Sequence, residues 1–169
     1  STVIMSVKNT KICAYLNQIR GRVRLAPLRR HYKWCTSLLV PRVDISTSID
    51  KYIYVVVKRQ IGIVEYKYRV NWSKVEFRNS IEEIEHPIVR EALKIMEINF
   101  PLEITTFADI PAQTGLGSSS AFAVGLVHAL YALKGQMATK YQLAAKGAEI
   151  EVDMLGRIMG KQDHFAAAY

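Results

Sequence analysis

The chain has 169 residues, of which 50% are hydrophobic and 22% are charged, with a formal net charge of +8. This composition suits one globular domain and excludes a disordered chain. Its two cysteines have no metal-ligand spacing, which argues against a disulfide framework and a cysteine-based zinc site. No apolar run reaches the roughly 18 residues that a membrane span needs, and no signal-peptide pattern opens the chain, so we expect a cytoplasmic protein without a membrane partner.

The positive charge is concentrated in the first third of the chain. Residues 1–60 hold 12 lysines and arginines against two acidic residues, whereas the remainder is slightly acidic. A basic segment can bind nucleic acid, but no nucleic-acid motif accompanies this one, so a solvated segment is the favoured interpretation. We expect a poorly patterned basic segment over residues 1–42 and one folded domain over residues 43–169.

From residue 49 onward the pattern predicts regular elements. Residues 49–59 are rich in tyrosine, isoleucine and valine and predict a strand. Residues 61–70 predict a second strand, and the short link between them favours a hairpin. A helix is expected from Pro87, which suits a first helical turn, to about residue 98, and a further strand over residues 102–108.

The second half of the sequence is mainly helical in pattern. Residues 111–117 form a loop by composition, and residues 121–133 predict a helix that is apolar nearly all round and therefore buried. Thr139 and Gln142 make a capping box for a last helix that runs to about residue 155. Strands that come before helices indicate an α+β fold rather than a doubly wound α/β sheet.

The loop before the buried helix has the features of an anion site. It reads Pro-Ala-Gln-Thr-Gly-Leu-Gly-Ser-Ser-Ser over residues 111–120. Its glycines permit close backbone approach, and the first helical turn leaves unpaired N–H groups with a partial positive charge. A phosphate suits such a terminus. The plainer alternative, a glycine turn before a serine-capped helix, is less favoured because the loop also carries a proline and three serines.

Two other phosphate-binding motifs do not fit this loop. A Walker A motif needs a lysine after its last glycine, and Ser118 follows Gly117. A dinucleotide-binding fingerprint needs a third glycine where Ser120 stands, and an acidic residue about 20 positions further on.

Residues 111–121 resemble the second motif of the GHMP kinases, Pro-x-x-x-Gly-Leu-Gly-Ser-Ser-Ala, and depart from it only at Ser120. Residues 46–55, 86–93 and 160–169 are similar to the sugar-kinase branch typified by D-glycero-D-manno-heptose 7-phosphate kinase. The resemblance implies that residues 43–169 are a GHMP N-terminal domain with the two-layer α+β fold of ribosomal protein S5 domain 2. It also implies ATP-dependent, Mg²⁺-dependent phosphorylation of a hydroxyl on a sugar or sugar phosphate, such as a heptose 7-phosphate.

The resemblance also implies roles for individual residues. Ser119 and Glu151 would ligate Mg²⁺, and Asp163 would lie near the acceptor hydroxyl as base or charge stabiliser. Arg29 stands where a cationic residue approaches the transferred phosphate, and Asp50 and Lys161 are expected to bind the sugar substrate. The residues expected to wrap the ATP phosphates are Pro111, Thr114, Gly115, Leu116, Gly117, Ser118, Ser119 and Ser120.

Helical geometry leaves a choice among the acidic residues near the presumed metal. On an ideal α-helix Glu149 and Asp153 share one face, and Glu151 points about 160° away from Glu149. The helix cannot aim all three at one ion. The family pattern selects Glu151, with Glu149 as the alternative; a solvated helix face is the plainer interpretation of all three.

The sequence departs from the family in its first motif, Arg-Ala-Pro-Leu-Arg-Ile-Ser-Phe-x-Gly-Gly-Gly-Thr-Asp. Residues 24–29 keep its start with Leu25 inserted, but the triple glycine and the Thr-Asp pair are absent. We expect the third motif and the C-terminal domain to be absent as well. We therefore expect an N-terminal fragment with weak or no turnover alone, and self-association through uncovered apolar surface at residues 165–169. The competing hypotheses are an S5-like RNA-binding module and a non-catalytic remnant.

Overall fold

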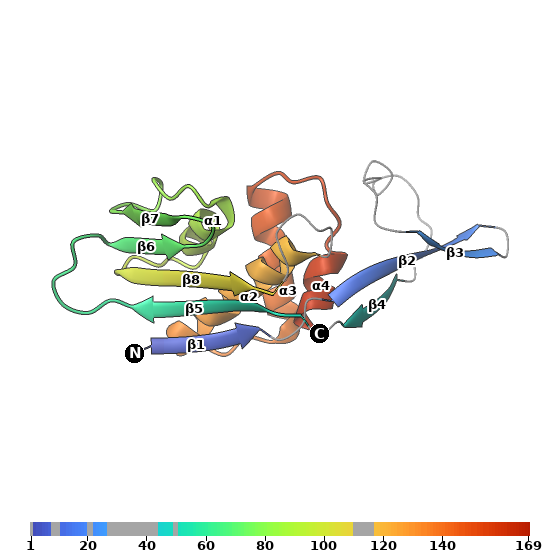
Figure 1. The fold of residues 1–169 in the computed structure, drawn as a ribbon, viewed down its shortest axis with the longest axis horizontal. Helices are drawn as coiled ribbons and strands as arrows, with labels where there is room; N and C mark the ends of the chain where they lie inside the picture. Colours follow the sequence, from blue (N-terminus) through green and yellow to red (C-terminus); the bar gives the residue numbers. More distant parts are fainter. Residues whose placement is uncertain (1, 8–10, 20–21, 27–43, 49–50, 110–116) are drawn as a thin grey trace.

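The computed structural model describes residues 2–7, 11–19, 22–26, 44–48, 51–109 and 117–169 (Figure 1). These residues form a five-stranded sheet and a three-stranded sheet, together with helices that follow the last strand or lie between strands. Among the residues described, no helix has the length and apolar character needed to cross a bilayer.

The five-stranded sheet has the order β1-β5-β8-β6-β7, and every neighbouring pair is antiparallel except the parallel pair β6–β8. Its strands are β1 (Thr2–Val7), β5 (Ile53–Arg59), β8 (Leu102–Ala108), β6 (Tyr68–Asn71) and β7 (Val75–Arg78). The three-stranded antiparallel sheet has the order β3-β2-β4 and consists of β2 (Lys11–Ile19), β3 (Arg22–Ala26) and β4 (Asp44–Ser48).

Strand β8 lies at the centre of the larger sheet, and its bounds are those predicted from the sequence. Alternate residues of β5 and β8 are buried, as expected for strands with one face against a core. Val57 pairs with Ile104 in the β5–β8 register, and both side chains belong to the core.

The predicted hairpin between residues 49–59 and 61–70 is wrong. Strand β8 lies between β5 and β6, so these two strands are not neighbours. Strand β6 also begins only at Tyr68, and the preceding segment leaves Ile61 and Ile63 exposed to solvent. The short link resembled a hairpin turn, but pairing with the distant β8 takes the place of local pairing.

Three strands lie in the stretch where the sequence showed no clean periodicity, residues 1–42. Strand β1 pairs with β5 at the edge of the larger sheet, and β2 pairs with both β3 and β4. The β1–β5 and β2–β4 pairs join segments that are remote in sequence, which a local pattern does not reveal, whereas β2 and β3 follow one another in the chain.

The helices are α1 (Pro87–Ile95), α2 (Ser118–Leu133), α3 (Lys140–Ala148), a π-helix η2 (Glu149–Met154) and α4 (Gln162–Ala168). Pro87 lies in the first turn of α1, and the capping box between Thr139 and Gln142 is present at α3, as predicted. Helix α2 begins at Ser118, three residues before its predicted start, with Gly117 as N-cap.

Helix α2 is the buried helix that its composition predicted. Ten of its residues are buried, including the continuous run from Ser120 to Val127. It packs against β1 and β5 on one side and against α1, α3 and α4 on others. This explains why it needs no polar face.

The last predicted helix is interrupted. The regular α-helix ends at Ala148, and residues 149–154 continue as a π-helix, whose wider turn changes the direction of every later side chain. The positions assigned to acidic residues on an ideal α-helix therefore do not apply beyond Ala148.

The apolar surface expected to be uncovered at residues 165–169 is largely covered. Helix α4 packs against α2 and α3, Ala167 is buried, and the ring of Phe165 lies 5.7 Å from that of Tyr141. Tyr169 stays exposed.

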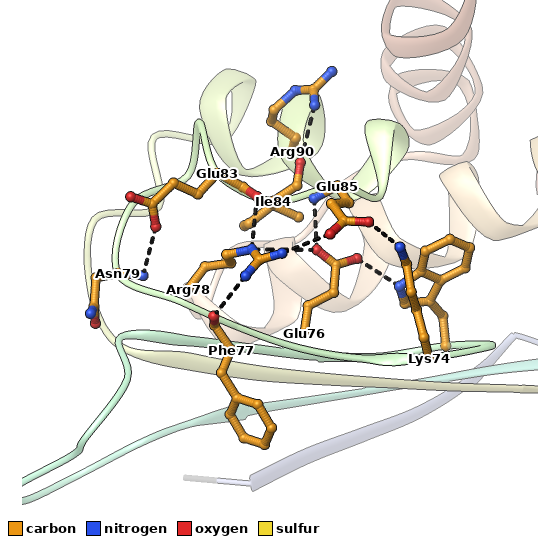
Figure 2. Close-up of polar contacts among 10 residues, drawn as sticks. Lys74, Glu76, Phe77, Arg78, Asn79, Glu83, Ile84, Glu85 and Arg90 are labelled. Atoms are coloured by element: carbon orange, nitrogen blue, oxygen red, sulfur yellow. Dashed lines mark hydrogen bonds and ion pairs between the residues drawn. The ribbon is translucent and has the colours of Figure 1, made fainter.

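A buried carboxylate joins β7 to the turn that leads into α1. Both oxygens of Glu76 accept hydrogen bonds, from Trp72 Nε1 and from the Glu85 main-chain N–H, each at 2.7 Å. Arg78 donates to the side chain of Glu85 at 2.7 Å and to the Glu83 carbonyl at 2.9 Å, so several bonds join the two segments (Figure 2). These bonds position His86, which caps α1 by accepting from the Val89 N–H.

Replacing an isoleucine by alanine should destabilise the protein much more in the core than in the β5–β6 segment. Ile104→Ala should lower the free energy of unfolding by about 2–5 kcal/mol, because it opens a cavity in the core. Ile63→Ala, at a fully exposed site, should change it by no more than about 0.5 kcal/mol. Urea denaturation measures both, and equal losses would contradict the placement of β8 at the centre of the core.

Candidate functional site

The start of α2 is set by Gly117, whose φ of +71° lies in the left-handed region that favours glycine. A side chain added at Gly117 would lie 3.6 Å from Cγ of Asp163, so the first turn of α2 and the first turn of α4 are adjacent. The next residues place three serine side chains in this turn. Ser120 is completely buried, and its hydroxyl has no hydrogen-bond partner within the described part of the chain.

The carboxylate of Glu151 is completely buried beside that turn. Its Oε1 accepts hydrogen bonds from the Ser119 hydroxyl and from Arg157 Nη1. Arg157 Nη1 also donates to Ser119 Oγ at 2.8 Å. The second carboxylate oxygen lies 2.9 Å from His164 Nε2, another completely buried atom. Four side chains from three segments thus form one polar cluster, which we call the Glu151 cluster.

The path of the chain explains how Arg157 reaches Glu151. The π-helix η2 ends at Met154, and Gly156 follows with a φ of +61°, again in the left-handed region. This residue reverses the chain, and the Arg157 main-chain N–H then donates to the Glu151 carbonyl at 3.1 Å. The main chain and the side chain of Arg157 therefore both donate hydrogen bonds to Glu151.

The surroundings of Glu151 lower its pKa. Burial alone would raise the pKa, but hydrogen bonds from His164 and Ser119, with the positive charges of His164 and Arg157, outweigh that effect. The net result is a pKa below the ordinary 4.5, so the carboxylate is ionised at neutral pH.

The structure distinguishes Glu151 from the other two acidic residues. Glu149 is partly exposed and pairs with Lys146 Nζ at 3.0 Å, and Asp153 faces Lys161 Nζ at 3.8 Å on the surface. Glu151 is the acidic residue that meets the serine turn.

The expected site residues divide into three groups. Gly117, Ser118, Ser119 and Ser120 lie at the start of α2, where Ser119 meets Glu151 of η2 and Gly117 lies against Asp163 of α4. Lys161 lies at the N-cap of α4, on the surface. The remaining expected residues lie outside the described part of the chain: Arg29, Asp50, Pro111, Thr114, Gly115 and Leu116.

Sequence reasoning missed Arg157 and His164. His164 follows Asp163 directly, so the resemblance over residues 160–169 pointed to its neighbourhood but gave it no role. Arg157 follows Gly156, whose left-handed turn is the only local signal for a side chain that folds back onto the preceding helix.

The donor set suits Mg²⁺. The Ser119 hydroxyl and the Glu151 carboxylate are hard oxygen ligands, and they are already in contact through a hydrogen bond. Mg²⁺ is commonly held by one or two protein oxygens together with substrate phosphates. These residues would hold the ion if Arg157 moved away from them.

Glu151 should make stability depend on pH. A lowered pKa in the folded chain contributes stability that is fully present above pH 4.5 and is lost as pH falls through the folded-state value. Glu151→Gln should cost about 3 kcal/mol at pH 7 because it breaks a buried ion pair, and this difference from the wild type should shrink below pH 4.5. Urea denaturation between pH 7 and pH 3.5 measures it.

The matched control is Glu149→Gln, which removes a partly exposed charge from the same segment. It should change stability by no more than about 1 kcal/mol. A constant difference for Glu151→Gln across the pH range would contradict the assigned direction of the pKa shift.

Comparison with known proteins identifies the family of the chain. Residues 81–169 match the family model described as the GHMP kinases N terminal domain. The D-glycero-alpha-D-manno-heptose 7-phosphate kinase of Campylobacter jejuni is 36% identical over 64 residues, which are 38% of this chain and 19% of that protein.

Solved structures share the fold. A D-glycero-D-manno-heptose 1-phosphate kinase from Bacteroides thetaiotaomicron has a TM-score of 0.63 at 24% identity, over 73% of this chain and 44% of that one. The mevalonate kinase of Methanococcus jannaschii has a TM-score of 0.63 at 16% identity, over 98% of this chain and 51% of that one. The chain thus spans about half or less of the length of these proteins. Since the family model covers more than half of it, the chain belongs to the GHMP kinase family.

Proposed function

We propose that this chain is the nucleotide-binding part of an ATP-dependent kinase that phosphorylates a hydroxyl group of a sugar or sugar phosphate. The observation that carries the proposal is the convergence of the Ser119 hydroxyl and the Glu151 carboxylate at the N-terminus of α2, beside Asp163. A helix N-terminus favours phosphate, and the two oxygens suit the metal ion that accompanies it.

Each residue has a distinct part in this proposal. The first turn of α2, with Gly117, Ser118, Ser119 and Ser120, binds the phosphates through main-chain N–H groups and hydroxyls. Ser119 and Glu151 hold Mg²⁺. When bound, the ion neutralises charge on the phosphates and helps to position them for transfer.

Asp163 is proposed to act on the acceptor. In phosphoryl transfer the acceptor hydroxyl oxygen forms a bond to the γ-phosphorus, the bond from that phosphorus to the bridging oxygen of ADP breaks, and the hydroxyl proton must leave. A carboxylate near the start of α2 can accept that proton or stabilise the charge, and Asp163 lies against Gly117 there.

The acceptor is proposed to be a heptose phosphate. The support is the name of the Campylobacter jejuni relative, a heptose 7-phosphate kinase. Lys161, with its exposed ammonium at the start of α4, is proposed to bind the sugar phosphate together with Asp50, and Arg29 is proposed to approach the transferred phosphate.

Nucleotide binding should depend on Gly117. Gly117→Val places a β-branched residue at a positive φ, which distorts the turn and blocks backbone approach to the phosphates. Calorimetry with ATP should detect no binding.

Gly62→Val is the matched control because Gly62 also has a positive φ, +99°, but lies in the β5–β6 segment, where an added Cβ would meet nothing within 4 Å. It should carry a similar backbone penalty and bind ATP normally. Equal loss in both variants would mean that the effect is on folding rather than on the site.

The two metal ligands should act only through Mg²⁺. Ser119→Ala and Glu151→Gln should each weaken ATP binding in the presence of Mg²⁺, by about tenfold or more, and should change metal-free binding much less, because oxygen ligands are lost. Titrations of ATP with Mg²⁺ and with EDTA measure this. The same metal effect in Glu149→Gln, and none in Glu151→Gln, would show that the wrong acidic residue was chosen.

A further inference from the structure

The guanidinium of Arg157 occupies the position where a metal ion would meet the protein. Nη1 donates to both oxygens that the proposed function assigns to the metal, Ser119 Oγ at 2.8 Å and Glu151 Oε1. A single positively charged nitrogen therefore bridges the two ligands, as a metal ion would.

These contacts use the electron pairs that a metal would need. Glu151 Oε1 accepts from both Ser119 and Arg157, which engages its two lone-pair positions. The other carboxylate oxygen faces His164 at 2.9 Å. A divalent ion could take Oε1 only by displacing Arg157, because the two positive charges would otherwise repel one another at contact distance.

Arg157 differs from His164 in its freedom to move. Its side chain is 38% exposed, whereas that of His164 is completely buried. The guanidinium can therefore turn toward solvent without being left as an unpaired buried charge. Phosphate oxygens offer it an alternative partner, since arginine binds phosphate through two parallel hydrogen bonds.

We propose that Arg157 is a resident cation that closes the metal position to free divalent ions and releases it when nucleotide phosphates bind. This inference rests on the proposed function, because Ser119 and Glu151 must be the metal ligands. Its consequence is that the metal ion and the nucleotide bind cooperatively. Each raises the affinity for the other because both require Arg157 to leave the Glu151 cluster.

The test measures Mn²⁺ binding to the full chain without nucleotide, by electron paramagnetic resonance of the free ion. The variant Arg157→Gln should bind Mn²⁺ about tenfold more tightly than the wild type, a typical size for coupling between two binding events. The gain should disappear in the double variant Arg157→Gln/Glu151→Gln. A merely structural role would not produce tighter binding on removal of the side chain.

Lys146→Gln is the matched control. It removes one positive charge from the neighbouring helix, where Lys146 pairs with Glu149 rather than Glu151. It should leave Mn²⁺ affinity unchanged. An equal gain in Mn²⁺ affinity in Lys146→Gln and Arg157→Gln would show that the effect comes from the overall charge of the protein, and it would overturn the inference. Unchanged or weaker Mn²⁺ binding by Arg157→Gln would also overturn it.

A second measurement avoids the risk that Arg157→Gln does not fold. In the wild type, the side-chain Nε–H resonance of Arg157, assigned with Arg157→Lys, should not move on addition of Mg²⁺ alone. It should shift on addition of Mg²⁺ with a non-hydrolysable ATP analogue. A shift with Mg²⁺ alone, or none with either addition, would overturn the inference.

The two proposals can fail separately. If the wild type binds ATP in a Mg²⁺-dependent way but Arg157→Gln gains no Mn²⁺ affinity, the inference about Arg157 fails and the proposed function stands. If Arg157→Gln gains Mn²⁺ affinity through Glu151 but no variant binds ATP, the closing of the metal position by Arg157 stands, whereas its release by nucleotide and the proposed nucleotide site both fail.

Discussion

A carboxylate excluded from water is costly unless ionic and hydrogen-bonding partners surround it. Glu151 meets this condition with three side chains that come from different segments: the first turn of α2, the turn after η2 and the first turn of α4. The need to compensate one buried carboxylate therefore determines where the N-terminus of α2 lies, and with it the position at which a phosphate would be bound.

A second buried carboxylate has a comparable effect at the start of α1. Glu76 ties β7 to the start of α1, and the ring of His86 at that start lies 5.2 Å from Phe122 in α2. Burial holds the pKa of His86 below its ordinary value, with a smaller contribution from the charge of Arg157. Helix α2 is therefore positioned at both α1 and α4, while its apolar side chains fill the space between.

The sequence predicted correctly those features of the fold that depend on residues close together in the chain. Strand β8, the Pro87 start of α1, the capping box of α3 and the burial of α2 depend on residues close together in the chain. The hairpin prediction was wrong because β5 pairs with β8, more than 40 residues later. Arg157 was missed because its contact with Glu151 depends on a π-helix and a glycine turn. Neither of these produces a recognisable pattern of hydrophobic residues in the sequence. The roles of all the expected site residues stay predictions, both for those that the structure describes, such as Ser119, Glu151 and Asp163, and for Asp50, Arg29 and the loop before α2.

The π-helix η2 has a consequence for comparing this chain with others of its family. A π-helix contains more residues per turn than an α-helix, so removal of one residue from 149–154 would leave a regular helix with similar ends. Each later side chain would then keep its place around the axis but stand one position earlier in the sequence. A relative with an uninterrupted helix must therefore carry its equivalent acidic residue at a different offset from the capping threonine. The residue of a relative that is equivalent to Glu151 is therefore better identified by its contact with the serine turn than by its position in a sequence alignment.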